Sequence, residues 1–265
     1  MVTACALVRV PAGYVTRVGN FMFNPQAPPH EVSSRSLLFG HALAAAFKAR
    51  SRNLPSAPAS LPALLDACRN GTPGLLGRPG VRDALGEIRA RLFHAPGREA
   101  EAQTSWHESV AAAVFAARLA QIRGASVAGA FSGGLFHRAG EALALKMLAR
   151  VELEYRMKMD SASRRDWCTT HGHELAERLV RAWVLSPEAG VCVLGWQQFG
   201  EFAEVSAESA ALYFGRLFAM ELLQPAFCIP GAVDHAATEI GLTADMVAQV
   251  RAEEGRAREF IRALD

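Results

Sequence analysis

The chain has 265 residues, of which 51% are hydrophobic and 20% are charged, and its formal net charge at pH 7 is +2. A chain this long and this apolar can bury a large core, which excludes global disorder and predicts one large domain or two small domains around a shared core. The near balance of 28 basic and 26 acidic residues gives no long-range field for nucleic acid or an anionic membrane, so neither partner is expected.

The cysteines and the lack of targeting signals predict a cytoplasmic protein. The cysteines are widely spaced and form no CxxC pair, which is typical of reduced thiols that serve as small apolar fillers. They are Cys5, Cys68, Cys168, Cys192 and Cys228. The N-terminus lacks the basic and long apolar regions of a signal peptide. No membrane span is predicted, because charged or polar residues interrupt every run of about 18 residues that would be needed.

Residues 1–30 differ in pattern from the rest of the chain. Their β-branched and aromatic residues are punctuated by Pro11, Gly13 and Gly19, which fits a short β-hairpin or an extended arm. A group of prolines then marks a break.

After this break the apolar residues recur at helical spacing, and strand-like alternation is absent. The pattern predicts an N-terminal helical subdomain over residues 31–100 and a helical core over residues 101–265, which together form one continuous unit. The expected fold class is therefore an all-α, multi-helix bundle.

The expected helices have recognisable start and stop signals. Ser33 or Ser34 is expected to cap the first, and Thr169 or Thr170 the one that contains His171 and His173. In chain order, the expected helices cover residues 34–46, 61–67, 79–94, 106–123, 126–136, 140–159, 170–183, 187 onward and 204–223, with two short ones within 237–261.

Three smaller signals refine this pattern. Gly124 is expected to end the alanine-rich helix, and Thr243 to begin one of the last two helices. Gly133 and Gly134 are expected to let a neighbouring helix approach closely, at a helix-propensity cost of about 1 kcal/mol each.

Three histidines lie in motifs whose order and context resemble a known family. The motifs are SWHES at 105–109 with His107, AFSGGLFHRAG at 130–140 with His137, and HELAERL at 173–179 with His173. Any one histidine near a helix end is more often a cap or a satisfied surface group than a ligand. Together, over residues 104–223, the motifs resemble the HDOD branch (HD-related output domain) of the HD superfamily of metal-dependent phosphohydrolases.

The departures from the family pattern concern its metal ligands. The family's His-Asp pair is replaced by His137-Arg138, and an arginine has no acceptor and stays protonated. Trp-Gln-Gln at 196–198 and the run 212–216 stand near the family's later histidine pair and final aspartate, and neither offers a carboxylate. The resemblance therefore implies a degenerate site without metal or cofactor, and without catalytic residues. Its vestigial positions are His107, His137, Arg138 and His173.

Arg138 needs an acidic partner or an anion if it is buried. Glu141 lies three residues further on and Glu108 lies beside His107, and either could supply an internal salt bridge that replaces the metal and holds the same helices together. The alternative is an anion pocket formed by Arg138, His107 and His137, suited to a phosphate or a nucleotide. A weak zinc site also stays open if His107, His137 and His173 converge.

The resemblance implies a non-catalytic signalling or regulatory module of a bacterial pathway that works through protein partners. A divergent metal-dependent phosphohydrolase, acting on a nucleotide or phosphoester, is an alternative that needs another carboxylate converging on His107 and His137. The third alternative is a protein that binds an anion or a small ligand. The aromatic residues of the C-terminal third are expected to be core rather than docking surface. They are Trp183, Trp196, Phe199, Phe202, Tyr213, Phe214 and Phe218.

Overall fold

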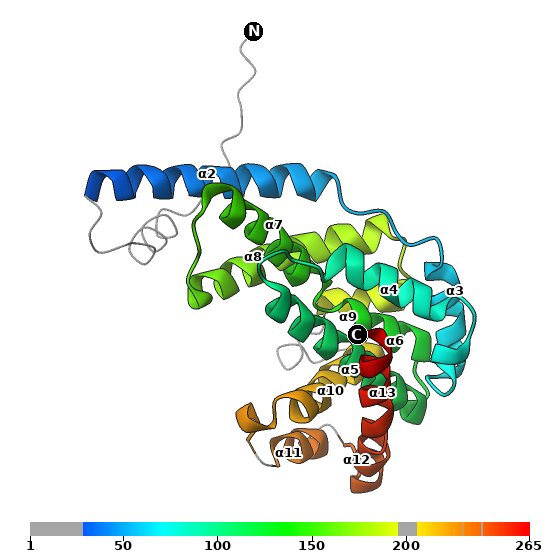
Figure 1. Ribbon diagram of the computed structural model, residues 1–265. Coiled ribbons are helices and arrows are strands. Elements are labelled where there is room, and N and C mark those ends of the chain that lie inside the picture. The colour runs from blue at the N-terminus through cyan, green and yellow to red at the C-terminus, as the bar shows by residue number, and fades with distance from the viewer. Residues whose placement is uncertain (1–28, 196–205, 230, 240) are drawn as a thin grey trace.

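The computed structural model describes residues 29–195, 206–229, 231–239 and 241–265 (Figure 1). All regular elements within these ranges are helical, which confirms the expected all-α multi-helix fold. The α-helices are α2 (Pro29–Arg52), α3 (Leu61–Ala67), α4 (Val81–Leu92), α5 (Glu99–Arg123), α6 (Val127–Phe136), α7 (Ala139–Tyr155), α8 (Ser161–Ala182), α9 (Pro187–Gly195), α10 (Ala207–Leu223), α11 (Ala232–Glu239), α12 (Ala244–Arg251) and α13 (Glu254–Leu264). Short 3₁₀ segments are η1 (Cys68–Asn70), η2 (Leu75–Gly77) and η4 (Pro225–Phe227).

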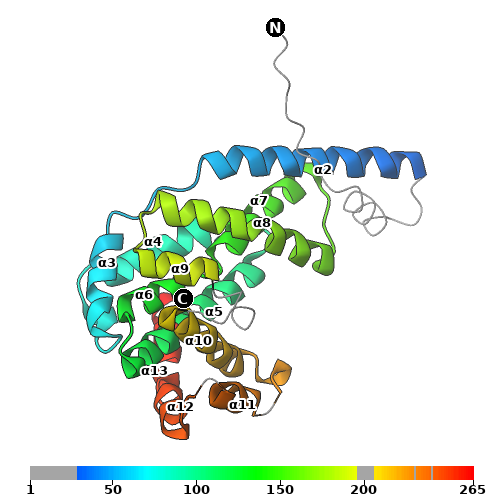
Figure 2. The ribbon, with the colours of Figure 1, turned by 180° about the vertical axis from the view of Figure 1, so that it is seen from behind.

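Helix α5 is the central element of the bundle. It packs against α6 and α10 along its length, and against α12 and α13 from the C-terminal part of the chain. Helix α6 also contacts α9, and α7 pairs with α8. The long helix α2 lies along α7 at one end of the molecule, whereas α11, α12 and α13 lie at the other end (Figures 1 and 2).

Several predicted helix boundaries are confirmed. Helix α3 covers the expected residues, and Gly124 ends α5 in the left-handed conformation, with a φ of 67°. The Ser126 hydroxyl accepts a hydrogen bond from the Gly129 amide (3.2 Å), and the Thr243 hydroxyl accepts one from the Met246 amide (3.3 Å). Each bond satisfies an amide that the first helical turn leaves without a partner.

The predicted start of the helix that carries His171 and His173 is wrong. Helix α7 ends with Arg156 in the left-handed conformation, and α8 already begins at Ser161. The Asp160 carboxylate caps α8 by accepting hydrogen bonds from the amides of residues 162 and 163, both at 3.0 Å. Thr169, Thr170 and both histidines therefore lie inside α8, because an aspartate upstream provides an N-cap that the threonines were expected to supply.

Other boundaries also differ from the predictions. Helix α2 begins at Pro29, so Ser33 and Ser34 do not cap it, and α5 begins at Glu99 rather than near Trp106. The segment 237–261, expected to hold two final helices, begins inside α11, so in the described residues three α-helices follow α10. The expected arm or hairpin over residues 1–30 lies outside the described residues, apart from the first two residues of α2.

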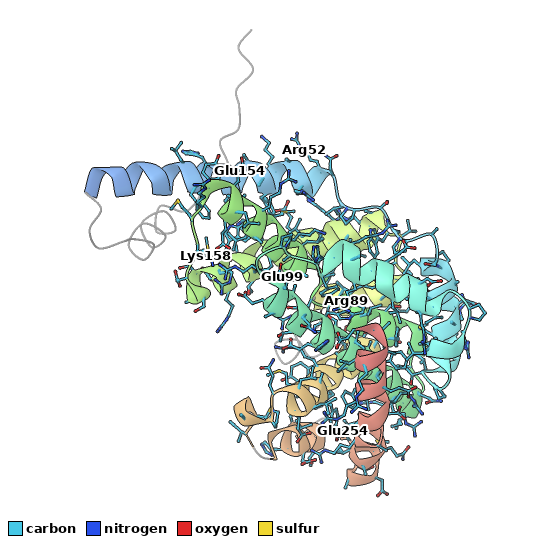
Figure 3. All side chains as sticks on the ribbon, in the orientation of Figure 1. Arg52, Arg89, Glu99, Glu154, Lys158 and Glu254 are labelled. Carbon is cyan, nitrogen blue, oxygen red and sulfur yellow. The ribbon has the colours of Figure 1, made fainter. Side chains whose placement is uncertain are left out.

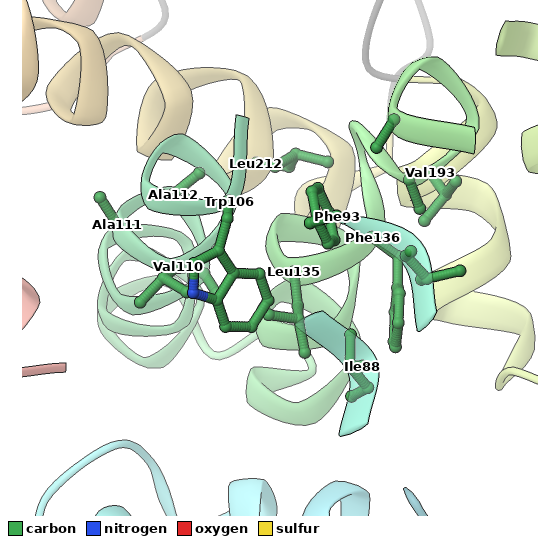
Figure 4. Close-up of a cluster of buried hydrophobic side chains, with 14 of the residues drawn as sticks. Ile88, Phe93, Trp106, Val110, Ala111, Ala112, Leu135, Phe136, Val193 and Leu212 are labelled. Atoms are coloured by element: carbon green, nitrogen blue, oxygen red, sulfur yellow. The ribbon is translucent and has the colours of Figure 1, made fainter. Parts of the chain in front are cut away.

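Large apolar side chains fill the space around α5 (Figure 4). Trp106 is fully buried, and its ring centroid lies 5.2 Å from that of Phe93, at the end of α4. Buried apolar residues from α2 to α13 form one cluster, so the described parts of the two expected subdomains share a core. Trp183, Phe214 and Phe218 are buried within it, as expected of core aromatic residues.

Glycines set the distance between α5, α6 and their neighbours. A Cβ atom added to Gly134 would lie 2.4 Å from the Ala113 Cα, and one added to Gly215 would lie 2.7 Å from the Ala116 amide nitrogen. A Cβ atom at Gly133 would lie 2.4 Å from the Cys192 Cβ. The close approach expected at Gly133 and Gly134 is therefore confirmed: Gly134 lies against the α5 backbone, and Gly133 lies against the Cys192 side chain.

The helices and the cysteines were compared with the expectations from the sequence. No helix in the described residues is long and apolar enough to cross a membrane. Cys68, Cys168 and Cys192 are buried as free thiols, and burial raises the pKa values of Cys168 and Cys192 to about 12. These thiols therefore stay protonated and serve as apolar fillers, as expected.

A buried ion pair ties the N-terminus of α5 to the end of α7. Arg98 Nε and Nη2 donate hydrogen bonds to the two carboxylate oxygens of Glu152, each at 2.9 Å. The Met159 amide donates a third to Glu152 Oε1, at 2.7 Å. The Glu152 side chain is only 5% exposed, so it depends on these donors.

We expect Glu152→Ala to lower the free energy of unfolding by about 3 kcal/mol, because it leaves a buried amide without its acceptor and a largely buried guanidinium with only the Glu101 carboxylate, 3.4 Å away. The control is Glu177→Ala, which removes an exposed ion pair with Arg181 and should change the same quantity by less than about 1 kcal/mol. Urea unfolding measures both, and equal effects would contradict the structural role of Glu152.

Two helical glycines should respond to alanine in opposite directions. Gly134→Ala forces a methyl group into the α5 backbone and should destabilise by about 1–3 kcal/mol or more. Gly86→Ala in α4 has no atom within 4 Å of the new methyl group and should stabilise by about 0.5–1 kcal/mol. Thermal unfolding of the two variants measures both signs, and a stable Gly134→Ala protein would show that α5 and α6 lie further apart.

Candidate functional site

Arg138 lies at the junction of α6 and α7, where it binds two carboxylates. Its Nη2 atom is 2.9 Å from Glu141 Oε2, and its Nη1 atom donates to Glu108 Oε2. The second Glu108 oxygen accepts a hydrogen bond from Gln224 Nε2, at 2.6 Å. Both acidic partners expected for Arg138 are therefore present, and the contacts connect α5 and α7 with the end of α10.

Arg216 on α10 adds a second guanidinium to this neighbourhood. Burial lowers the pKa of Arg216, as does the charge of Arg138, whereas Glu108 and Glu141 act in the opposite direction. We call Glu108, Arg138, Glu141, Arg216 and Gln224 the arginine–glutamate cluster. Its two guanidinium groups and two carboxylates balance one another in charge.

His137 is buried beside the cluster as a neutral side chain. It is 4% exposed, and its Nδ1 atom lies 2.7 Å from the carbonyl oxygen of Gly134. A carbonyl oxygen only accepts, so Nδ1 carries the proton. Burial lowers the pKa of His137 to about 3, and the charges of Arg138 and Arg216 act in the same direction. The imidazole therefore adds no charge to the site at neutral pH.

His107 does not contact the carboxylates of the cluster. Its Nε2 atom lies 2.8 Å from Asp265 Oδ1, just beyond the end of α13. Arg89 Nη2 lies 3.5 Å from the same oxygen, and Figure 3 shows Arg89 beside α13. Successive residues of a helix point about 100° apart. This offset lets Glu108, rather than its neighbour His107, contact Arg138.

His173 is exposed on α8. The described residues hold no group of three or more histidine, cysteine, aspartate or glutamate side chains that could bind a metal ion. The converging zinc site considered from the sequence is therefore absent from the described ranges. In the alternative interpretation Arg138 and His107 would line one anion pocket, whereas in the structure they contact different carboxylates. The Trp-Gln-Gln segment at 196–198 lies outside the described residues.

The donor set does not fit the divalent metal that an HD-type site implies. Glu108 and Glu141 each direct a carboxylate oxygen at the guanidinium of Arg138. A permanent cation thus sits between the two carboxylates and would repel a second one. The arrangement can neutralise buried charge and connect helices, and it provides no open coordination position among the described residues.

Sequence reasoning missed Arg216 and Gln224. The run 212–216 offers no carboxylate, but the arginine at its end is a signal for a second cation near Arg138. Nothing in the local sequence indicates Gln224, because its contact with Glu108 spans more than a hundred residues of chain.

A shallow cleft of about 360 Å³ lies elsewhere, where α5, α10, α12 and α13 meet. Phe115 and Phe218 contribute to its apolar lining. Its Arg251 is paired with Asp234 (2.8 Å) and Glu221 (3.1 Å). This cleft shares no residue with the arginine–glutamate cluster.

Residues 84–197, from within α4 to just beyond α9, match the family model of the HDOD domain. This part of the chain is therefore similar to the HDOD domain, in agreement with the resemblance identified from the motifs. The match begins and ends earlier than the stretch 104–223 identified from the motifs, and it covers under half of the chain. Neither curated proteins nor solved structures gave a match.

His137 makes stability depend on pH. Its pKa is about 3 in the folded protein against 6.5 without the fold, so the unfolded chain binds more protons between these values. The free energy of unfolding should therefore fall as pH drops below about 6.5, by up to about 1.4 kcal/mol per pH unit. Urea unfolding between about pH 5 and 8 measures this slope.

The comparison is between His137→Asn, which removes the titrating group, and His173→Asn, which alters an exposed histidine of α8. The first should flatten the slope below pH 6.5, and the second should leave it unchanged. A slope that persists in His137→Asn would assign it to other groups.

Proposed function

We propose that this protein is a non-catalytic signalling or regulatory module with an HDOD domain, in which the metal site of the wider HD superfamily has degenerated. One observation carries the proposal. At the position of the family's metal-binding aspartate stands Arg138, which is bound to Glu108 and Glu141.

Metal-assisted hydrolysis of a phosphoester needs a cation that activates water and binds phosphate oxygens. Catalytic zinc sites typically use three protein ligands and keep one position open. In the described residues His107 pairs with Asp265, and His173 is exposed. The surroundings of these two histidines therefore support a role other than metal-assisted hydrolysis.

The regulatory role is supported by analogy with the HDOD family, and the fold by itself does not define a partner. Because the cluster binds its own charges internally, we assign recognition to the outer faces of the bundle, with a protein as the partner. The phosphohydrolase alternative and the anion-binding alternative become outcomes of the experiments below.

The first test is the metal content of protein purified without chelator or metal-affinity resin. We expect far less than one manganese, iron, nickel or zinc ion per chain, and no hydrolysis of bis(p-nitrophenyl) phosphate after incubation with Mn²⁺ or Zn²⁺. A near-stoichiometric metal together with turnover would overturn the proposal and establish the phosphohydrolase. Stoichiometric binding of phosphate or a nucleotide would instead establish the anion-binding protein.

A second test uses the vestigial ligand positions in cells. The double variant His107→Ala/His173→Ala removes two of the family's histidine positions, and neither side chain is buried. If the module is non-catalytic, this variant should restore the phenotype of a deletion strain as well as the wild-type protein does. Loss of function at an unchanged protein level would indicate that the histidines take part in chemistry.

A further inference from the structure

The C-terminal end of α2 is held in place by hydrogen bonds from α8 and the residue after it. Arg178 Nη1 donates to the carbonyl oxygen of Ser51 (3.1 Å), and Trp183 Nε1 donates to that of Pro55 (2.7 Å). The side chains at this end of α2 are therefore presented from a fixed backbone, so a partner would bind them with little further loss of conformational freedom.

Arg50 of α2 and Lys146 of α7 bring two positive charges close together at this end. Lys146 Nζ donates to the carbonyl oxygen of Arg91 (3.0 Å) and lies 3.4 Å from that of Ala90, in the last turn of α4. Burial lowers the pKa of Lys146, and so does the charge of Arg50. Both side chains are half-buried. Like charges in a partly desolvated position repel each other, so an anion that reaches both would stabilise the pair.

Among the described residues, the acidic side chains of the adjoining helices bind other cations. Glu87 of α4 contacts Arg91, and Glu174 of α8 contacts Arg178, each at 2.6 Å. The Arg50 guanidinium forms no hydrogen bond or ion pair within the described part of the chain. Its donors are therefore available to a group from outside the chain.

The rest of this part of α2 is also basic. Residues 32–65 contain arginines and a lysine but no aspartate or glutamate. Lys48 and Arg52 are exposed, and Figure 3 shows Arg52 at the end of α2. In Figures 1 and 2 no other described helix covers the side of α2 that faces away from α7. We call Lys48, Arg50, Arg52 and Lys146 the α2 basic surface.

We propose that the α2 basic surface recognises an acidic segment of a protein partner, and that one carboxylate of this segment binds between Arg50 and Lys146. The inference deepens the proposed function and rests on it, because it names the outer face at which the regulatory module would meet its partner. It also gives the chemistry of that partner.

Charge and side-chain size favour an acidic protein segment over other anionic macromolecules. The net charge of +2 gives little long-range attraction to a polyanion, so binding depends on a few short-range contacts. Helices that lie in a membrane surface carry large apolar side chains beside the basic ones, whereas the exposed neighbours of Lys48 are Ala45 and Ala49. A carboxylate on a flexible segment can bind both Arg50 and Lys146 at short range.

The binding experiment uses fluorescein-labelled hexaglutamate as the acidic segment and follows its fluorescence anisotropy with the full chain, in buffer that contains EDTA. The wild-type protein should bind this peptide, and more weakly at about 200 mM than at about 50 mM salt. Arg50→Glu should bind at least about tenfold more weakly, because it places a carboxylate where that of the peptide would bind.

The matched control is Arg123→Glu, at the end of α5. Arg123 is exposed, and its replacement changes the net charge by the same amount away from α2. This variant should keep the wild-type affinity for hexaglutamate within about twofold. An equal loss in both variants would mean that the peptide responds only to net charge, which would overturn the inference.

Thermal unfolding tests whether Arg50 and Lys146 share a position for an anion. Arg50→Glu brings a carboxylate to the Lys146 ammonium. Its effect on Tm should therefore be more favourable in the wild-type background than in a Lys146→Gln background, where the cation is missing. Equal effects in the two backgrounds would show that the two positions are not coupled, and the inference would fail.

Three further results count against the inference. The first is a wild-type protein that does not bind hexaglutamate, and the second is an unchanged affinity in Arg50→Glu. The third is tighter binding of a thymidine oligonucleotide or of phosphatidylserine vesicles than of hexaglutamate, which would assign the surface to a nucleic acid or to a membrane.

These measurements are separate from those that test the proposed function. The metal content and hydrolytic activity of the wild type decide whether the protein is catalytic, whereas EDTA keeps metal ions out of the peptide titration. A phosphohydrolase could still bind hexaglutamate through α2, and a non-catalytic module could fail to bind it, so the two failures are distinguishable.

Discussion

The arrangement of the central helices depends on the neutralisation of Glu108. This carboxylate lies on α5, the helix around which the bundle is built, and its side chain is almost completely buried. A buried carboxylate without a counter-charge is among the most destabilising features a core can contain. Arg138 and Gln224 approach it from the α6–α7 junction and from the end of α10. The position of one charge therefore fixes how three parts of the chain meet.

Close backbone packing makes this requirement strict. Gly134 of α6 and Gly215 of α10 bring their backbones against Ala113 and Ala116 of α5, so these helices have little freedom to slide or rotate. Because the helices cannot shift, the side chains that neutralise Glu108 must be long enough to reach its carboxylate. The long, donor-rich side chain of arginine can do so from a neighbouring helix end.

A tethered cation differs from a metal ion in two ways that matter here. A metal contributes to stability only in proportion to its concentration and affinity, whereas a guanidinium on the same chain is always present. A metal also keeps coordination positions that can accept water or substrate, whereas an arginine bound to two carboxylates has none to offer. Arg138, at the position where the resembling motif has an aspartate, thus supplies a permanent charge without an open coordination position.

Local signals in the sequence predicted the features that depend on few residues. The helical class followed from periodicity, the end of α5 from Gly124, and the close approach at α6 from Gly133 and Gly134. The ion pairs of Arg138 were also predictable, since one partner lies three residues away and the other beside a motif histidine. The start of α8 was mistaken because a threonine pair and a nearby aspartate are both adequate caps, and only packing shows which one begins the helix.

The rotation of α5 about its axis was not predictable in the same way. This helix is buried on most of its circumference, so it carries no apolar stripe to indicate which residue faces which neighbour. The choice between His107 and Glu108 was therefore open until the neighbouring helices were placed. The contact of Glu108 with Gln224 depends on the same placement.

The rotation of α5 also determines where a ligand can act on this protein. It directs His107 to Asp265 and Glu108 to Arg138, so each charged group that the vestigial site retains already has a partner within the chain. An anion approaching Arg138 would have to displace a carboxylate that is held by the same fold, and a cation would meet two guanidinium groups. Because the cluster is balanced in charge and His137 is neutral, neither kind of ion gains much by binding there. The proposed recognition of a protein partner therefore involves the surface of the bundle, where binding leaves undisturbed the charges that hold α5 in place.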